Sequence, residues 1–256
     1  MSIVVFDSGI GGLSVLREAR VLMPEHRFVY VADDASFPIG GWEEGALVKR
    51  LMDVFEDLVE RYDPSMIIVA CNTASTIILP HLRERFDFPI VGTVPAIKPA
   101  AEKTASGQIS VLATPGTVQR DYTRALVSEF ASHVNVRLVG AENLAELAEE
   151  FMLTGDVDDD AVAQEVSECF TDRLGARTDV VVLACTHYPF LTNVFRRLAP
   201  WPVDWLNPAE SIARHAQSLL PTRGEILEVQ DVAEFTKGRP RAEMLRLMSG
   251  FGLKVV

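Results

Sequence analysis

Short, continuous runs of aliphatic residues recur along this 256-residue chain, and each is too short to form a helix of ordinary length. Runs that are apolar on both faces are typical of strands in a parallel sheet that is covered on both sides. We therefore predict strands at residues 3–6, 28–31, 66–70, 90–92, 109–113, 134–138, 180–184 and 203–205.

The stretches between these runs carry helical periodicity. In residues 47–61, apolar side chains recur at i, i+4, i+7, i+8 and i+11, which places them on one face of a helix. Residues 144–153 and 161–174 have similar patterns, and the acidic stretch 156–160 suits the N-terminus of the second helix. The alternation of strands and helices predicts an α/β fold with mainly parallel sheets.

A weak internal repeat suggests two similar α/β units. IVVFDSGIGGLSVLREA begins at residue 3 and ISVLATPGTVQRDYTRA at residue 109, so that Ser8 matches Thr114. Two other aliphatic runs end in Ala-Cys, at Cys71 and Cys185. Ligands of open α/β sheets bind beyond the carboxyl ends of the strands, where all four turns are expected to lie. If the two units face one another, both cysteines line one cleft.

Composition and charge favour a globular enzyme of the cytoplasm. Hydrophobic residues make up 48% and charged residues 23%, which is ordinary for a soluble domain with a sizeable core. The net charge of −12, without a Lys/Arg cluster, argues against a nucleic-acid partner. We see no signal-peptide pattern and no apolar run of about 18 residues, so we expect no membrane partner. Three widely spaced cysteines predict reduced thiols, not disulfides.

The two Ala-Cys turns are the strongest candidates for chemistry. A cysteine between a strand and a helix lies near unpaired backbone N–H groups, which favour the thiolate. A single buried cysteine is usually only a small apolar side chain, and we interpret Cys169 in this way. Two cysteines in matching turns indicate proton transfer at both faces of one carbon, with inversion of its configuration. Such an acid–base pair works best when both pKa values lie near the working pH.

Neighbouring polar residues extend this prediction. His187 follows Cys185 by two residues and is expected to tune that thiol or to protonate a substrate group. Asp7 is expected either to have a chemical role, in which it pairs with a substrate ammonium or activates Cys71, or to serve as a helix cap or turn residue. Asn72, Thr73, Thr186 and Ser8 are candidate donors to a developing negative charge.

Two other kinds of site do not fit the sequence. The glycines at residues 9–12 match neither phosphate-loop pattern, although with Ser8 they can hold a carboxylate at a helix N-terminus. Cys185 and His187 form a lone C-x-H pair, so we predict no metal site.

The motifs resemble those of the cofactor-independent glutamate racemases, a family of the aspartate/glutamate racemase superfamily. The resemblance covers roughly residues 3–215 and rests on VFDSGIGGLSVL, DDASFPIG, VACNTAS, LATPGTV and LACTHYPFL. It implies a cofactor-independent isomerase that interconverts L- and D-glutamate and supplies the D-isomer for peptidoglycan in the cell wall. It also implies two lobes related by pseudo-twofold symmetry, with the active site in the cleft between them. The implied lobes are residues 1–96 with 207–256, and residues 97–206.

The same resemblance assigns roles to individual residues. Cys71 and Cys185 are implied as the two catalytic acid/bases, assisted by Asp7 and His187. An acidic residue of the second lobe aligns with LAELAEEF, where Glu149 is the best match and Glu150 the next, unless both lie on a solvated helix face. The implied substrate contacts are Asp7, Ser8, Ile39, Gly40, Asn72, Thr73, Thr114, Thr117, Thr186 and His187. Members of the family are commonly dimers, so a homodimer is expected.

The chain departs from the family pattern at a few positions. Ile39, Asp34 and Ser36 stand where the family usually has Tyr, Thr and Arg. VDWLNPAES replaces a common VDSGEA pattern, which puts Asn207 near a usual acidic position. No feature after about residue 222 predicts a function.

Three other functions are alternatives. A racemase of the same superfamily acting on aspartate or another acid would keep the mechanism and change the substrate. A cysteine hydrolase or transferase would use Cys71 or Cys185 as a nucleophile with His187 as its base, but it leaves the matched pair of cysteines unexplained. A solute-binding module without chemistry would not need either thiol.

Overall fold

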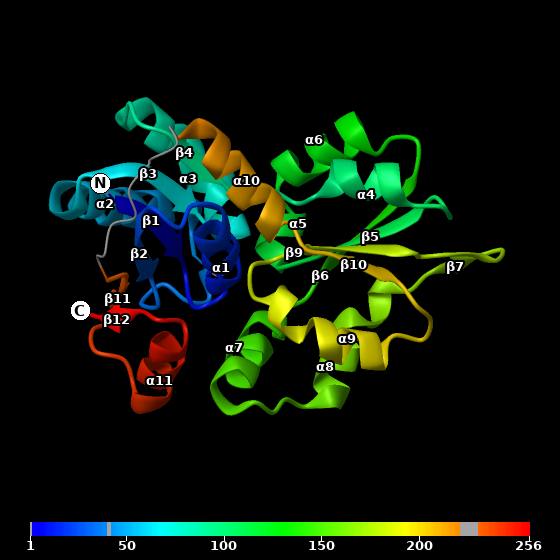
Figure 1. Cartoon of the computed structure of the whole chain (residues 1–256). Helices are drawn as coiled ribbons and strands as arrows, with labels where there is room; N and C mark the ends of the chain where they lie inside the picture. Colours follow the sequence, from blue (N-terminus) through cyan, green and yellow to red (C-terminus); the bar gives the residue numbers. More distant parts are fainter. Residues whose placement is uncertain (1, 40–41, 221–229) are drawn as a thin grey trace. The chain divides into compact units, whose positions relative to one another are not determined.

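The computed structural model describes residues 2–39, 42–220 and 230–256, and its contacts divide the chain into two units (Figure 1). The first unit consists of Met1–Thr93 with Ala209–Val256, and the second of Val94–Pro208. No helix in the described ranges is both long and apolar enough to span a membrane.

A parallel sheet forms the centre of the first unit, with the strand order β12-β11-β2-β1-β3-β4 among its described residues. These strands are β1 (Ser2–Asp7), β2 (Arg27–Ala32), β3 (Pro64–Val69), β4 (Ile90–Gly92), β11 (Val232–Phe235) and β12 (Lys254–Val255). The accompanying helices are α1 (Leu13–Leu22), α2 (Glu44–Tyr62), α3 (Asn72–Arg85), α10 (Ala209–Leu219) and α11 (Ala242–Gly250). Since the strands are parallel, their carboxyl ends meet at one edge of the sheet.

Two features of its sequence favour the helix α2: apolar residues at helical spacing and a capping residue at its N-terminus. Its apolar residues Leu47, Leu51, Phe55 and Leu58 are buried, as the helical periodicity predicts. At its N-terminus the carboxylate of Glu43 accepts a hydrogen bond from the Ala46 N–H at 2.8 Å, which satisfies one of the free amides of the first turn.

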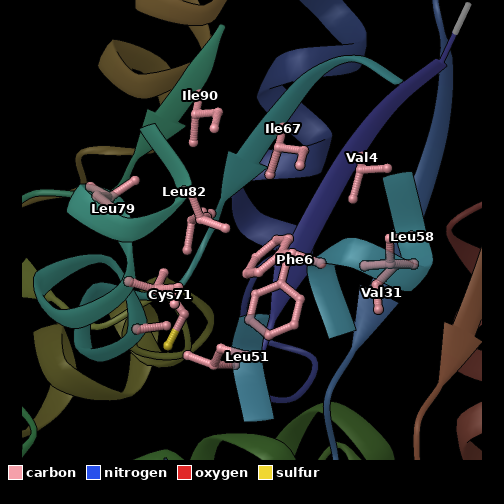
Figure 2. Close-up of a cluster of buried hydrophobic side chains, with 14 of the residues drawn as sticks. Val4, Phe6, Val31, Leu51, Leu58, Ile67, Cys71, Leu79, Leu82 and Ile90 are labelled. Carbon is pink, nitrogen blue, oxygen red and sulfur yellow. The ribbon is translucent and has the colours of Figure 1, made fainter. Parts of the chain in front are cut away.

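The core of the first unit lies between this helix, α3 and the sheet (Figure 2). The ring centroids of Phe6 on β1 and Phe55 on α2 are 4.7 Å apart. Cys71 and Ile39 belong to the same buried apolar cluster. Two predicted site residues are therefore packed into the apolar core of this unit.

The second unit contains a smaller parallel sheet with the strand order β10-β9-β5-β6. These strands are β5 (Gln108–Ala113), β6 (Asn135–Gly140), β9 (Val180–Ala184) and β10 (Asp204–Leu206). The helices are α4 (Ile97–Lys103), α5 (Pro115–Val118), α6 (Asp121–Phe130), α7 (Leu144–Thr154), α8 (Asp159–Val166) and α9 (Thr192–Leu198), with 3₁₀ turns at Ser167–Cys169 and Tyr188–Leu191. A short antiparallel hairpin joins β7 (Asp172–Arg173) to β8 (Ala176–Arg177).

The α/β fold with two parallel sheets is confirmed, and all the predicted strands are present with bounds shifted by at most two residues. The acidic stretch before α8 caps that helix as predicted, because Asp158 accepts hydrogen bonds from the backbone of Asp160 and Ala161. Cys169 is fully buried in an apolar cluster, as expected of a packing residue.

The predicted helix 161–174 is wrong in its second half. Helix α8 ends at Val166, and the chain enters the hairpin at Asp172. Tertiary hydrogen bonds take the backbone carbonyls that a longer helix would use: Ser110 Oγ donates to the Cys169 carbonyl at 2.7 Å, and Arg137 Nε to the Glu168 carbonyl at 3.1 Å. Strands β11 and β12 are not among the predicted strands; both are short and lie toward the edge of the sheet.

Candidate active site

The thiol of Cys71 lies at the carboxyl end of β3. Cys71 is the N-cap of α3, has an extended backbone and is 6% exposed. Strand β1 is the parallel neighbour of β3, and Ser8 follows its last residue. The Oγ of Ser8 lies 3.6 Å from the Sγ of Cys71. The structure therefore brings together the hydroxyl turn and the cysteine turn of the first unit.

Asp7 is the last residue of β1, and its side chain is fully buried. Its Oδ2 accepts a hydrogen bond from the Gly12 N–H at 2.8 Å. A Cβ on residue 12 would lie 2.8 Å from the Cβ of Asp7, which is closer than real Cβ atoms approach. Glycine is thus required for this close contact. The carboxylate fixes the turn before α1, which is one of the two roles predicted for Asp7.

Asn72 and Thr73 are the first two residues of α3, and both are buried. Neither Oδ1 nor Nδ2 of Asn72 has a hydrogen-bond partner within the described part of the chain. Leaving such groups buried and unpaired costs about 1–3 kcal/mol each. Both atoms belong to the residue that directly follows Cys71.

In the second unit, three predicted residues form a chain of contacts. Cys185 follows the last residue of β9 and is 7% exposed. Its Sγ lies 3.7 Å from Nδ1 of His187, and Nε2 of His187 lies 2.9 Å from Oε1 of Glu149 on α7. The alternative acid, Glu150, is exposed. Of the two glutamates that the sequence left open, the structure places Glu149 at the histidine.

This geometry determines which nitrogen of His187 carries a proton. An ionised carboxylate only accepts hydrogen bonds, so Nε2 is the donor to Glu149. Nδ1 then faces the sulfur of Cys185, as an acceptor in the neutral ring or as a donor in the imidazolium. The same ring can therefore take a proton from the thiol or stabilise the thiolate.

The hydroxyl turn of the second unit lies beside the Cys185 turn. Strands β5 and β9 are parallel neighbours, with Ala113 opposite Ala184 at their ends. Thr114 follows β5, and its Oγ1 lies 3.1 Å from Oγ1 of Thr117, which is fully buried. Thr186 is also buried, directly after Cys185.

Of the remaining predicted contacts, Ile39 is 6% exposed and packs in the apolar cluster that contains Cys71. Gly40 lies outside the described residues.

The two units repeat one arrangement of strands (Figure 1). The order β2-β1-β3-β4 in the first corresponds to β6-β5-β9-β10 in the second. In each unit a hydroxyl turn follows one central strand, and a cysteine turn follows its parallel neighbour. The weak sequence repeat therefore corresponds to a repeat of sheet order, with one cysteine turn in each copy.

Comparison with known proteins agrees with this arrangement. A model of the family described as Asp/Glu/Hydantoin racemase matches residues 14–216. The chain belongs to this racemase family. The racemase is 61% identical over 257 residues to a protein of Rhizobium meliloti (strain 1021) named glutamate racemase, covering 99% of this chain and 93% of the relative. A glutamate racemase of Agrobacterium fabrum is also 61% identical, over 99% of this chain and 94% of the relative.

Solved structures of glutamate racemases share the fold of this chain. The structure of Escherichia coli glutamate racemase in complex with L-glutamate and the activator UDP-MurNAc-ala matches with a TM-score of 0.91 and 36% identity, over 99% of this chain and 96% of that one. Glutamate racemase from Thermus thermophilus, in complex with β-chloro-D-alanine, matches with a TM-score of 0.75 and 28% identity over 100% and 94% of the chains. The predicted resemblance to the racemase family is confirmed.

Sequence reasoning missed Tyr188 of the racemase. Its side chain is fully buried beside the Cys185 turn. Burial raises the pKa of Tyr188 well above its usual value, and the nearby Cys185 and Glu165 add to this effect. The phenol therefore stays neutral beside the Cys185 turn. The signal in the sequence was a large aromatic residue directly after Cys-Thr-His.

An open cavity of the racemase, about 390 Å³ in volume, lies elsewhere in the first unit. It is bordered by residues of α2 and β11, including Arg50, Arg61 and Glu234, and by Thr236. Its lining includes none of the predicted site residues. The chemistry of the turns, and not the size of a cavity, identifies the candidate active site.

Proposed function

We propose that the protein is a glutamate racemase that interconverts L- and D-glutamate by proton transfer at the α-carbon. The observation that carries the proposal is the matched pair of thiol turns, each with a polar partner: the hydroxyl of Ser8 for Cys71 and the imidazole of His187 for Cys185. Substrate identity is supported by relatives about 60% identical over nearly the whole chain that are named glutamate racemase.

In the proposed mechanism one thiolate removes the α-proton, and the thiol of the other cysteine returns a proton to the opposite face of the α-carbon. Cys185 exchanges its proton with Nδ1 of His187, while Glu149 keeps Nε2 protonated and the ring in place. Both directions use the same two thiols, so one enzyme serves both enantiomers. The proposed role of the product is to supply D-glutamate for peptidoglycan.

Substrate binding is proposed to use the polar groups around the two turns. The free Oδ1 and Nδ2 of Asn72 can accept from an ammonium and donate to a carboxylate. The hydroxyls of Ser8, Thr73, Thr114 and Thr186 are further donors, placed at carboxyl ends of parallel strands. Asp7 supplies negative charge in the first unit, which suits a substrate ammonium.

A homodimer in the cytoplasm is part of the proposal, on the strength of the family resemblance. Light scattering coupled to gel filtration tests the dimer directly. A monomeric mass would contradict that part of the proposal and leave the chemistry unaffected.

The decisive experiment is a racemisation assay in deuterated water with protein free of pyridoxal phosphate. The wild type is expected to convert each glutamate enantiomer into the other and to introduce deuterium at the α-carbon of the product. Cys71→Ser and Cys185→Ser should each abolish racemisation, with Cys169→Ser as the matched control that retains it. Activity on aspartate but not on glutamate would overturn the substrate. A trapped acyl-thioester would favour a cysteine hydrolase. Binding of glutamate without turnover would favour a binding module.

A further inference from the structure

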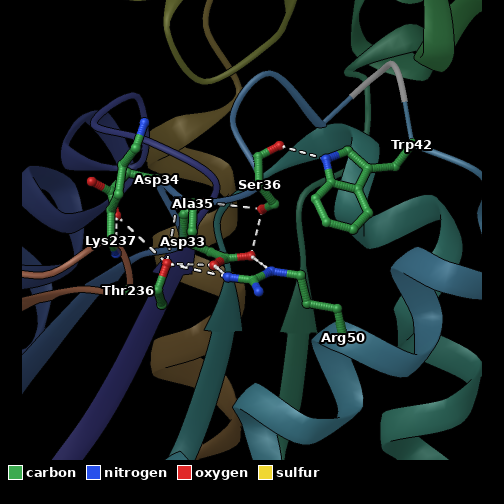
Figure 3. A network of polar contacts seen from close by, with 8 residues as sticks. All are labelled: Asp33, Asp34, Ala35, Ser36, Trp42, Arg50, Thr236 and Lys237. Atoms are coloured by element: carbon green, nitrogen blue, oxygen red, sulfur yellow. Dashed lines mark hydrogen bonds and ion pairs between the residues drawn. The ribbon is translucent and has the colours of Figure 1, made fainter.

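The segment after β2, residues 33–39, is held by a network of polar contacts from two distant parts of the chain (Figure 3). Asp33 follows the last residue of β2 and is completely buried. Arg50 of α2 pairs with it through two nitrogens: Nε donates to Oδ2 at 3.0 Å, and Nη2 donates to Oδ1. A buried carboxylate with a single bidentate cation is a strongly directional contact.

Thr236 joins the network from the C-terminal part of the chain, directly after β11. Its Oγ1 donates to Oδ1 of Asp33 at 2.5 Å and accepts from the Ala35 N–H at 3.3 Å. The next backbone amide, of Lys237, donates to Oδ1 of Asp34 at 2.9 Å. The three residues 33–35 are therefore tied to the end of β11, which lies some 200 positions later in the sequence.

The middle of the segment, at Ser36, is also held by hydrogen bonds. The Oγ of Ser36 donates to the Asp33 carboxylate, and Nε1 of Trp42 donates to the Ser36 carbonyl at 2.9 Å. The guanidinium of Arg50 lies 5.9 Å from the centroid of the Trp42 ring, within the range of a cation–π contact. The same cation thus contacts Asp33, at the start of the segment, and Trp42, which holds the Ser36 carbonyl.

This segment ends at a buried apolar residue of the core of the first unit. Ile39 is buried in the apolar cluster that contains Cys71. The contacts at residues 33–36 anchor the segment that ends at Ile39, and through it they bear on how Ile39 packs in this cluster. None of the residues that fix the segment was predicted as a site residue.

We propose that Arg50 and Thr236 are positioning residues for catalysis: through Asp33 they fix residues 33–39, and so the packing of Ile39 in the cluster that holds Cys71. The proposal rests on the racemase function proposed above. It assigns a task to the turn after β11, which carries none of the predicted catalytic residues.

Thr236→Val and Arg50→Gln test the proposal, with Thr236→Ser and Arg50→Lys as conservative partners. The Val variant loses a hydrogen bond to a charged group, so kcat/KM should fall about tenfold, mainly through a higher KM for glutamate. Arg50→Gln should lose more, because a buried carboxylate is left without its cation. Thr236→Ser should stay within about twofold of the wild type, because it keeps the hydroxyl.

Arg61→Gln is the matched control. Arg61 lies on the same helix and pairs with Glu234 of β11, but it does not contact the segment 33–39. Its KM and kcat should stay near those of the wild type even where its stability falls. A loss of kcat/KM equal to that of Thr236→Val would show that the strand acts only through stability and would overturn the proposal. If Arg50→Gln does not fold, the double variant Asp33→Asn/Arg50→Gln removes both charges together.

A second measurement separates this proposal from the proposed function. In Thr236→Val the alkylation rate of Cys71 should rise about fivefold or more, while that of Cys185 in the other unit stays unchanged. This readout does not depend on the substrate. Wild-type protein without activity on glutamate would contradict the racemase proposal alone. Unchanged alkylation of Cys71, together with an unchanged KM, would contradict the positioning role alone.

Discussion

The imidazole of His187 and the carboxylate of Glu149 form a hydrogen bond of 2.9 Å between Nε2 and Oε1, across 38 positions of the sequence. The bond connects the turn after β9 to helix α7. Since Nδ1 of the same ring lies 3.7 Å from the sulfur of Cys185, the carboxylate acts on the thiol through the ring. It determines the tautomer and the orientation of the group that exchanges protons with the thiol.

Glu149→Gln is expected to lower kcat for glutamate by about 10- to 100-fold, with a smaller effect on KM. Glutamine keeps an acceptor for the Nε2 proton but removes the charge that stabilises the imidazolium. Glu150→Gln is the matched control, because that neighbouring residue is exposed. The measurement is steady-state racemisation in both directions. Equal losses in the two variants would refute the role of Glu149.

Asn72→Ala should reduce activity without reducing stability. The wild-type side chain buries two polar atoms with no partner among the described residues, so its removal should leave the free energy of unfolding unchanged or raise it by about 1 kcal/mol. The KM for glutamate should rise about tenfold, because the substrate loses both hydrogen-bonding atoms. Chemical denaturation and kinetics measure the two effects. Asn193→Ala, at an exposed position of α9, is the control. A stability loss larger than in the control would contradict the assignment.

The three cysteines should differ in their reaction with iodoacetamide at about pH 8. Burial raises the pKa of Cys169 to about 12, and the charge of Glu168 contributes to the increase. The thiolate is the nucleophile, so Cys169 should stay unmodified in the folded protein while Cys71 and Cys185 react. Peptide mass spectrometry after timed labelling checks this. In urea all three should react alike, and fast labelling of Cys169 in the folded protein would count against its packing role.

The Asp33 network should make stability depend on acid pH. Burial opposes ionisation of Asp33, but hydrogen bonds from Arg50, Ser36 and Thr236 and the charge of Arg50 lower its pKa below the usual value. The unfolded chain therefore binds the proton more readily. The stabilisation is present above the unfolded-state pKa of about 3.9 and is lost as the pH falls through the lower folded-state pKa.

Asp33→Asn provides the comparison for this pH dependence. At pH 7 the wild type should be more stable than the variant, and the difference should shrink as the pH falls below about 4. Urea denaturation at pH 7 and pH 3 measures both values. If the difference in the free energy of unfolding between wild type and variant is the same at pH 7 and pH 3, the Asp33 carboxylate is not the source of the pH dependence.

Much of the fold followed from local patterns. The strand runs were recognisable because a strand covered on both faces must be apolar throughout, as β9 is. The pairing of Ser8 with Thr114 and of Cys71 with Cys185 was visible because both units repeat the same strand–turn–helix order. The predicted helix 161–174 failed because tertiary bonds from Ser110 and Arg137 compete for the backbone at its end, and no local pattern contains that information.

Local patterns are thus enough to predict the α/β class, the two thiol turns and the family resemblance, because hydrophobic periodicity and short motifs are properties of neighbouring residues. The tertiary structure alone decided which glutamate meets His187, that the polar atoms of Asn72 are left unpaired, and that Thr236 reaches back to Asp33. Each of these depends on atoms that only the packing of distant elements brings within 3 Å or leaves without a partner. Spacing along the chain does not encode such distances. The packing of distant elements therefore arranges the charges and polar groups that the chemistry needs.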